Sequence, residues 1–383
     1  MRRATTAAIA AALVCGALGA GAAPAGADGP GVGPATVVAV GDSAISGEAG
    51  RWAGNTNNSY TRVDALGPTA YYDNAANSAE TTPGCHRSKA AEIKIGVAES
   101  ANLACSGART YTQPYSSGSD FKPGLDFYDD GAGHIGQAKA LQTYAATHNV
   151  KLVVALIGAN NFGFASIVQR CVTDWLTSPT WWKNFCSDDA SVASMFTSSY
   201  VAQQQQLVND AFGNLKEAMR LAGYSAGSYT ILAQTYSSPI PNGGGFRYGE
   251  SGYRRQTIGG CGVWNRDADW ANATVVNTLN NVIRSAATLH GLPVLDAQGA
   301  LARHRLCENT VGLLEETGTP SWTSPGAADK SEWVSQIRTV STLVPPYQLQ
   351  EDLHPSYWGQ LALRNCVRQA YNGGAPRAGT CAS

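Results

Sequence analysis

Short apolar runs alternate with longer amphipathic segments along most of the chain. The valine-rich runs at 35–41 and 151–157 are each closed by a glycine, which is typical of strands buried on both faces of a parallel sheet. Shorter runs of the same kind lie at 101–108, 228–234 and 292–296. Helical periodicity is found at 88–98, 134–148, 201–221, 267–289 and 355–371. Strands that alternate with helices predict a parallel α/β sheet with helices on both faces.

Polar and glycine-rich stretches interrupt this alternation. Residues 51–80 and 300–350 have the composition of irregular loops, and we expect loop insertions near 165–197 and 242–266. Insertions of this kind often shape access to a site. Tryptophans in these stretches suit either a sugar or an acyl chain, although Trp52 is more typical of a core residue. The four tryptophans concerned are Trp52, Trp181, Trp182 and Trp264.

The N-terminus has the pattern of a secretory signal peptide. Arg2 and Arg3 precede an uncharged apolar stretch at 7–20, and residues 25–27 (AGA) match the small-residue cleavage pattern. The apolar stretch is too short to span a bilayer, and no later segment resembles a transmembrane helix. We therefore expect residues 1–27 to be removed, and residues 28–383 to form one secreted, extracellular domain.

Charge and cysteine content narrow the function classes. The formal net charge is −1 and only 14% of residues are charged, which argues against a nucleic-acid partner. Of nine cysteines, Cys15 leaves with the signal peptide and eight remain, an even number that indicates disulfides in an exported chain. The eight include no C-x-x-C pair, so we expect no metal site, and no cofactor either.

A candidate nucleophile and a candidate base stand at opposite ends of the sequence. Ser43 follows the first strand in the turn Gly41-Asp42-Ser43, where a parallel sheet presents residues to a ligand. His354 lies 311 residues later, three residues after Glu351 and two after Asp352. A serine needs a base to activate it, and the base needs a group that fixes its tautomer.

Two further turns follow predicted strands and offer hydrogen-bond donors. Gly107 has no side chain to block an anion from its backbone N–H. Asn160 follows the strand at 151–157 and carries a side-chain amide suited to an oxyanion. Viewed singly, each is equally explained as an ordinary turn residue.

Taken together, these residues resemble the four sequence blocks of the SGNH (GDSL) hydrolases, and especially secreted actinobacterial esterases and lipases. The blocks are Gly41-Asp42-Ser43, Gly107, Gly158-x-Asn160 and His354-Pro355, in the family's order. The resemblance implies a flavodoxin-like three-layer α/β/α sandwich with a parallel sheet. It also implies Ser43 as nucleophile, His354 as base, and an oxyanion hole formed by the Ser43 and Gly107 N–H groups with the Asn160 side chain.

The sequence departs from the family pattern at two positions. Asn161 stands where aspartate usually follows the asparagine, and Glu351 stands where aspartate usually precedes the histidine by three residues. Three arrangements of His354 remain open: orientation by Glu351, orientation by Asp352, or a Ser-His dyad in which a backbone carbonyl holds the ring.

The family's members also use local disulfides, and sequential pairing closes short loops. We therefore expect the pairs Cys85–Cys105, Cys171–Cys186, Cys261–Cys307 and Cys366–Cys381. The expected function is hydrolysis of a lipid, glycan or small-molecule carboxylic ester by a monomer, through an acyl-enzyme on Ser43. A carbohydrate O-acetylesterase with the same site, or a secreted binding protein without turnover, are the alternatives.

Overall fold

The apolar runs form the strands of one parallel sheet. The computed structural model describes residues 30–114 and 120–382, so the predicted signal peptide at 1–27 lies outside the described residues. Within them the strand order is β2-β1-β3-β4-β5-β6, with every neighbouring pair parallel. The first five strands have the order of flavodoxin-like folds. The strands are β1 Ala35–Gly41, β2 Glu99–Asn102, β3 Asn149–Leu156, β4 Thr230–Gln234, β5 Val294–Gly299 and β6 Gly379–Ala382.

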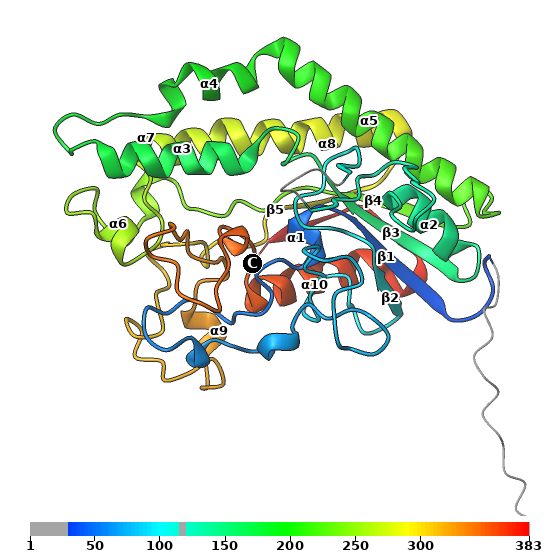
Figure 1. The fold of residues 1–383 in the computed structure, drawn as a ribbon, viewed down its shortest axis with the longest axis horizontal. Coiled ribbons are helices and arrows are strands. Elements are labelled where there is room, and N and C mark those ends of the chain that lie inside the picture. The colour runs from blue at the N-terminus through cyan, green and yellow to red at the C-terminus, as the bar shows by residue number, and fades with distance from the viewer. Residues whose placement is uncertain (1–29, 115–119, 383) are drawn as a thin grey trace, which may run out of the picture.

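Helices cover both faces of the sheet, which confirms the predicted three-layer α/β/α architecture. In Figure 1, α5 and α8 lie above the sheet and α10 lies below it. The helices are α1 Ser43–Ser46, α2 Gln137–Ala145, α3 Phe164–Thr177, α4 Ala190–Ala193, α5 Ser198–Leu221, α6 Arg254–Thr257, α7 Asn265–Trp270, α8 Asn277–His290, α9 Ala327–Lys330 and α10 Tyr357–Tyr371. A π-helical turn, Ala271–Val276, joins α7 to α8.

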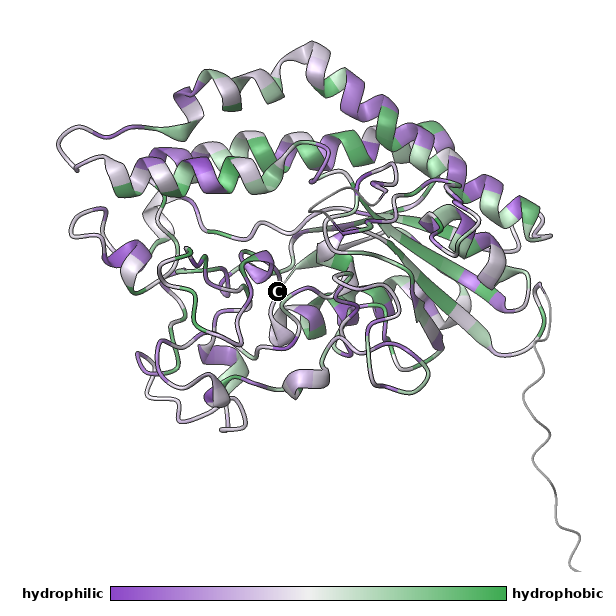
Figure 2. Cartoon of the chain, viewed as in Figure 1, coloured by the Kyte–Doolittle hydropathy of each residue, from purple (hydrophilic) through white to green (hydrophobic). Residues whose placement is uncertain are grey.

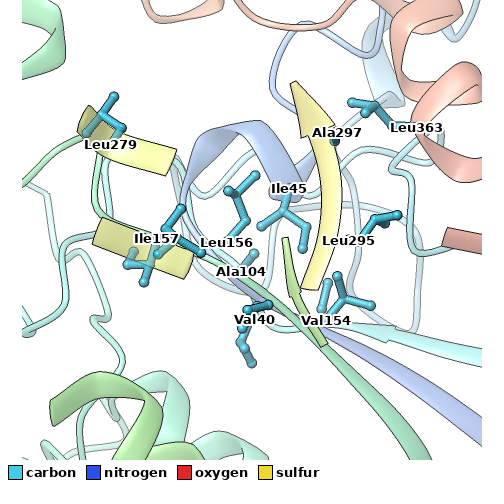
Figure 3. Close-up of a cluster of buried hydrophobic side chains, with 14 of the residues drawn as sticks. Val40, Ile45, Ala104, Val154, Leu156, Ile157, Leu279, Leu295, Ala297 and Leu363 are labelled. Carbon is cyan, nitrogen blue, oxygen red and sulfur yellow. The ribbon is translucent and has the colours of Figure 1, made fainter. Parts of the chain in front are cut away.

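The core lies between the sheet and these helices. Figure 2 shows green, hydrophobic strands between helices that are green on one side and purple on the other. In Figure 3, Val40, Val154 and Leu295 from three strands lie in one cluster with Ile45 of α1 and Leu363 of α10. Each fully buried aliphatic side chain contributes about 1.5–3 kcal/mol, so this cluster fixes where the strands end.

Two sequence predictions of secondary structure are wrong. Residues 88–98 form turns instead of a helix, since side chains of α10 bind their main chain: Arg364 donates to the Ala90 carbonyl and Arg368 to the Ile95 carbonyl. The segment 165–197, expected as loop, is largely helical: it contains most of α3, whose apolar residues recur every four positions, and all of α4.

Four disulfides stabilise connections outside the sheet. They join Cys85 to Cys105, Cys171 to Cys186, Cys261 to Cys307 and Cys366 to Cys381, the same neighbouring pairs that the sequence predicts. The last pair ties α10 to the short edge strand β6. None of the helices within residues 30–114 and 120–382 has the length and apolar character needed to cross a membrane.

Candidate active site

Ser43 is placed by a sharp turn at the end of β1. Gly41 has a φ of 142°, and a Cβ at this position would lie 1.9 Å from the Leu156 carbonyl oxygen, so only glycine fits between β1 and β3. The chain then enters α1, whose first residue is Ser43. The Asp42 carboxylate caps α1 by accepting a 3.2 Å hydrogen bond from the Ala44 N–H. This turn holds the Ser43 hydroxyl at the carboxyl edge of the sheet.

A tyrosine that follows β4 connects the Ser43 turn to the turn after β3. The Tyr236 hydroxyl donates a hydrogen bond to Asp42 and accepts one of 3.0 Å from the Ala159 N–H. Burial raises the pKa of Asp42 to about 7, although the Tyr236 hydrogen bond opposes that shift. The nucleophile turn and the Asn160 turn are therefore held in one hydrogen-bonded unit.

His354 contacts Ser43 directly. Its Nε2 lies 2.6 Å from Ser43 Oγ, and its Nδ1 lies 2.9 Å from the main-chain carbonyl oxygen of Asp352. A carbonyl only accepts hydrogen bonds, so Nδ1 must carry a hydrogen, and in the neutral ring Nε2 then has a free lone pair for the Ser43 proton. The ring has the tautomer that a general base requires.

An unusual backbone conformation aims the Asp352 carbonyl at the ring. Leu353, between Asp352 and His354, has a φ of +61°, a left-handed conformation that costs a bulky residue about 1–2 kcal/mol. Two main-chain hydrogen bonds to Ser335 hold it there, one from the Leu353 N–H and one to the His354 carbonyl. Strain of this kind persists where the surrounding structure over-determines the backbone.

The two neighbouring carboxylates face other partners. Glu351 is fully buried and accepts hydrogen bonds from the Tyr71 hydroxyl at 2.8 Å and the Gln348 N–H at 2.9 Å. One Asp352 carboxyl oxygen accepts a 2.9 Å hydrogen bond from the main-chain N–H of Arg338. Burial raises the pKa of Glu351, and it raises that of Asp352 to about 8. Of the three arrangements left open by the sequence, the observed contact is the backbone carbonyl.

The predicted oxyanion donors line the same cleft as Ser43 and His354. Gly107 has a φ of 79°, and within the described residues no acceptor binds its N–H or that of Ser43. One hydrogen of the Asn160 amide is donated to the Ala108 carbonyl at 2.9 Å, which leaves the second for a ligand. Asn161 bonds Thr110 through both its oxygen, which accepts the Thr110 main-chain N–H, and its nitrogen, which donates to the Thr110 hydroxyl.

The cleft has a volume of about 650 Å³, within the usual range for ligand pockets. The four tryptophans proposed from the sequence are not among the described residues that line it. Trp52 and Trp264 are each 1% exposed, whereas Trp181 and Trp182 are 83% and 73% exposed. Within the described residues no group of three His, Cys, Asp or Glu side chains is arranged to hold a metal ion.

A buried charged cluster behind His354 was missed by the sequence analysis. His86 Nδ1 lies 2.8 Å from a carboxylate oxygen of Glu48, and the His86 ring stacks on Tyr71 at 4.5 Å. Burial lowers the pKa of His86, but the Glu48 hydrogen bond and charge outweigh it and raise the pKa overall. The sequence placed Glu48 close to Ser43, and it lies two residues after the end of α1, but nothing in the sequence paired it with His86.

Burial also decides the charge of His354. Desolvation lowers its pKa, and the Glu48 charge and the Asp352 carbonyl oppose that shift without cancelling it. The ring is therefore neutral, and able to accept a proton, at neutral pH.

Comparisons with known proteins give structural neighbours only. No family model matches the chain, and no curated protein matches it in sequence. The chain is similar to an extracellular lipase from Streptomyces rimosus (18% identity, 86% of this chain and 98% of that one, TM-score 0.43). It is similar to phospholipase A1 from Streptomyces albidoflavus NA297 (18% identity, 86% of this chain and 96% of that one, TM-score 0.44). It is also similar to a carbohydrate acetylesterase from Sinorhizobium meliloti (9% identity, 74% of this chain and 93% of that one, TM-score 0.30).

Proposed function

We propose that this chain is a serine hydrolase of carboxylic esters, of the SGNH type, that works through an acyl-enzyme on Ser43. The observation that carries the proposal is the 2.6 Å contact between Ser43 Oγ and His354 Nε2, with Nδ1 held by a carbonyl. A hydroxyl beside a base of the correct tautomer is the arrangement that nucleophilic catalysis needs.

The reaction then follows from the positions of these groups. His354 Nε2 takes the Ser43 proton as Oγ bonds to the acyl carbon, and the negative charge moves to the carbonyl oxygen. The N–H groups of Ser43 and Gly107 and the remaining Asn160 hydrogen stabilise that charge. The bond to the alcohol breaks as His354 returns the proton to the leaving oxygen. Water deprotonated by His354 then cleaves the acyl-enzyme and releases the acid.

Labelling with a fluorophosphonate probe tests this proposal. We expect one covalent adduct, located on Ser43 by peptide mass spectrometry, and no adduct in the Ser43→Ala and His354→Ala variants. Ser237 also lines the cleft, so Ser237→Ala is the matched control and should label normally. A folded wild-type protein that takes up no probe would show a binding protein without turnover.

We also propose that the chain is exported. Four disulfides within the described residues favour an oxidising compartment, where such bonds persist. Expression of the full chain, followed by N-terminal sequencing of protein from the culture medium, tests this. A mature N-terminus near residue 28 is expected, and full-length protein retained in the cytoplasm would contradict it.

A further inference from the structure

One face of α3 forms a continuous apolar wall of the Ser43 cleft. Four residues of this helix line the cleft at intervals of four, which places them in one row. They are Phe164, Val168, Val172 and Leu176. The two polar α3 residues that also line the cleft, Gln169 and Thr173, are exposed and lie along its solvent side. We call the row of four the α3 strip.

The α3 strip has a defined inner and outer end. α3 begins at Phe164, four residues after Asn160, so the inner end of the strip adjoins the oxyanion turn. At the outer end Leu176 is 39% exposed, a large apolar side chain at the mouth of the cleft. From Phe164 to Leu176 is twelve residues, about 18 Å of helix at about 1.5 Å per residue.

Other parts of the cleft lining are apolar as well. They include Val276 and Leu279, where the π-helical turn meets α8, and Ile337. At the mouth, Val340 and Leu349 face the cleft and are 84% and 41% exposed. Exposed apolar side chains that continue a buried apolar wall mark a surface that binds an apolar ligand.

We propose that the α3 strip binds the acyl chain of the substrate, and that this chain is a fatty acyl group of about fourteen to sixteen carbons. The inference rests on the proposed function. A fully extended chain advances about 1.2 Å per backbone bond, so about 18 Å accommodates about fifteen bonds. An acetyl group would leave nearly the whole strip in contact with water.

The test compares kcat/KM for esters of increasing acyl length in variants substituted at different positions along the α3 strip. The acyl length at which kcat/KM falls should depend on the position of the substitution. The kcat/KM of the wild type for p-nitrophenyl esters should rise roughly 30-fold between butanoate and dodecanoate. Val168→Trp, near the inner end, should lower the dodecanoate value at least 10-fold and leave the butanoate value within about threefold. Leu176→Glu, at the outer end, should lower only the values for chains longer than about twelve carbons, such as tetradecanoate.

Matched controls separate position from helix stability. Ser166→Trp and Thr177→Glu introduce the same side chains at exposed α3 positions outside the cleft lining, and should leave the chain-length profile unchanged. A profile that peaks at acetate, or that Val168→Trp leaves unaltered, would overturn the proposal. So would a chain-length dependence seen only in alkyl acetates of increasing alcohol length, because the strip would then hold the alcohol.

A binding measurement keeps this inference separate from catalysis. Calorimetric titration of Ser43→Ala with butanoate, octanoate and tetradecanoate should show affinity rising by up to about fourfold per methylene. Leu176→Glu in the same background should weaken tetradecanoate alone. If the fluorophosphonate probe fails but this series persists, the proposed function is wrong and the acyl site stands. Equal affinities along the series would refute the acyl site by itself.

Discussion

Replacing Asp352 by asparagine tests how His354 is held. The contact to His354 Nδ1 comes from the Asp352 main chain, which the substitution retains. Loss of an orienting carboxylate costs up to about 10⁴-fold in kcat in a triad, whereas we expect less than about threefold here. The Arg338 N–H keeps an acceptor because the asparagine oxygen replaces the carboxylate oxygen.

The same substitution should change stability with a definite dependence on pH. The pKa of Asp352 is raised by burial to about 8, against about 3.9 in an unfolded chain. Between these values the folded state keeps a proton that the unfolded state has released, so stability falls as pH rises from about 4 to about 8. Four pKa units at about 1.4 kcal/mol each give an upper limit of about 6 kcal/mol, and relaxation around the charge reduces it to about 2–3 kcal/mol.

Urea unfolding and steady-state kinetics at pH 5 and pH 8 measure both effects. Asp352→Asn should exceed the wild type in unfolding free energy by about 2–3 kcal/mol at pH 8 and by much less at pH 5. Glu351→Gln is the companion variant, and it should lose stability because it weakens the Tyr71 hydrogen bond while keeping near-normal kcat. A drop of about 10³-fold or more in kcat for either variant would refute orientation by the backbone carbonyl.

Three further outcomes follow from the site. Asn160→Ala should lower kcat about 10²- to 10³-fold with little change in KM, whereas unchanged turnover would leave Asn160 a purely structural residue. In the pH dependence of kcat/KM, the apparent pKa of the acid limb should lie below the ordinary histidine value of about 6.5. Glu48→Gln should lower this apparent pKa further, because the Glu48 charge stabilises protonated His354. Removing the Cys85–Cys105 disulfide should lower the unfolding free energy measured in urea by about 2–4 kcal/mol, and it should also lower kcat, because the disulfide anchors Cys105 two residues before Gly107; full activity in the double-alanine variant would contradict that link.

The sequence was informative where local pattern decides structure. The buried strands β1 and β3 are apolar on both faces and end in glycine, so their positions and the residues that follow them were predictable. The helix predicted at 88–98 was wrong because α10, more than 260 residues away in sequence, supplies the hydrogen bonds that fix it as turns. The edge strand β6 was not predicted, since four residues held by a disulfide carry no periodic signal.

The orientation of His354 illustrates a second limit. It depends on the left-handed backbone of Leu353, and leucine is a residue from which no sequence rule predicts that conformation. Glu48 and His86 are likewise paired only by the fold, because they come from separate loops. Sequence blocks therefore located the two residues that meet at the candidate site, Ser43 and His354, whereas the groups that contact and surround His354 could be found only from three-dimensional contacts.

The separation of 311 residues between Ser43 and His354 also sets when the chain acquires its chemistry during synthesis. Ser43 emerges from the ribosome 311 residues before His354, and domains assemble as synthesis proceeds at about 5–20 residues per second. At that rate the base follows the serine by roughly 15–60 seconds, and it is held in place only after the segment around Ser335 has folded against it. A nascent chain, or one truncated before His354, thus carries an unactivated serine, and the proposed hydrolase would remain inert towards the lipids of the cell that makes it until His354 is in place.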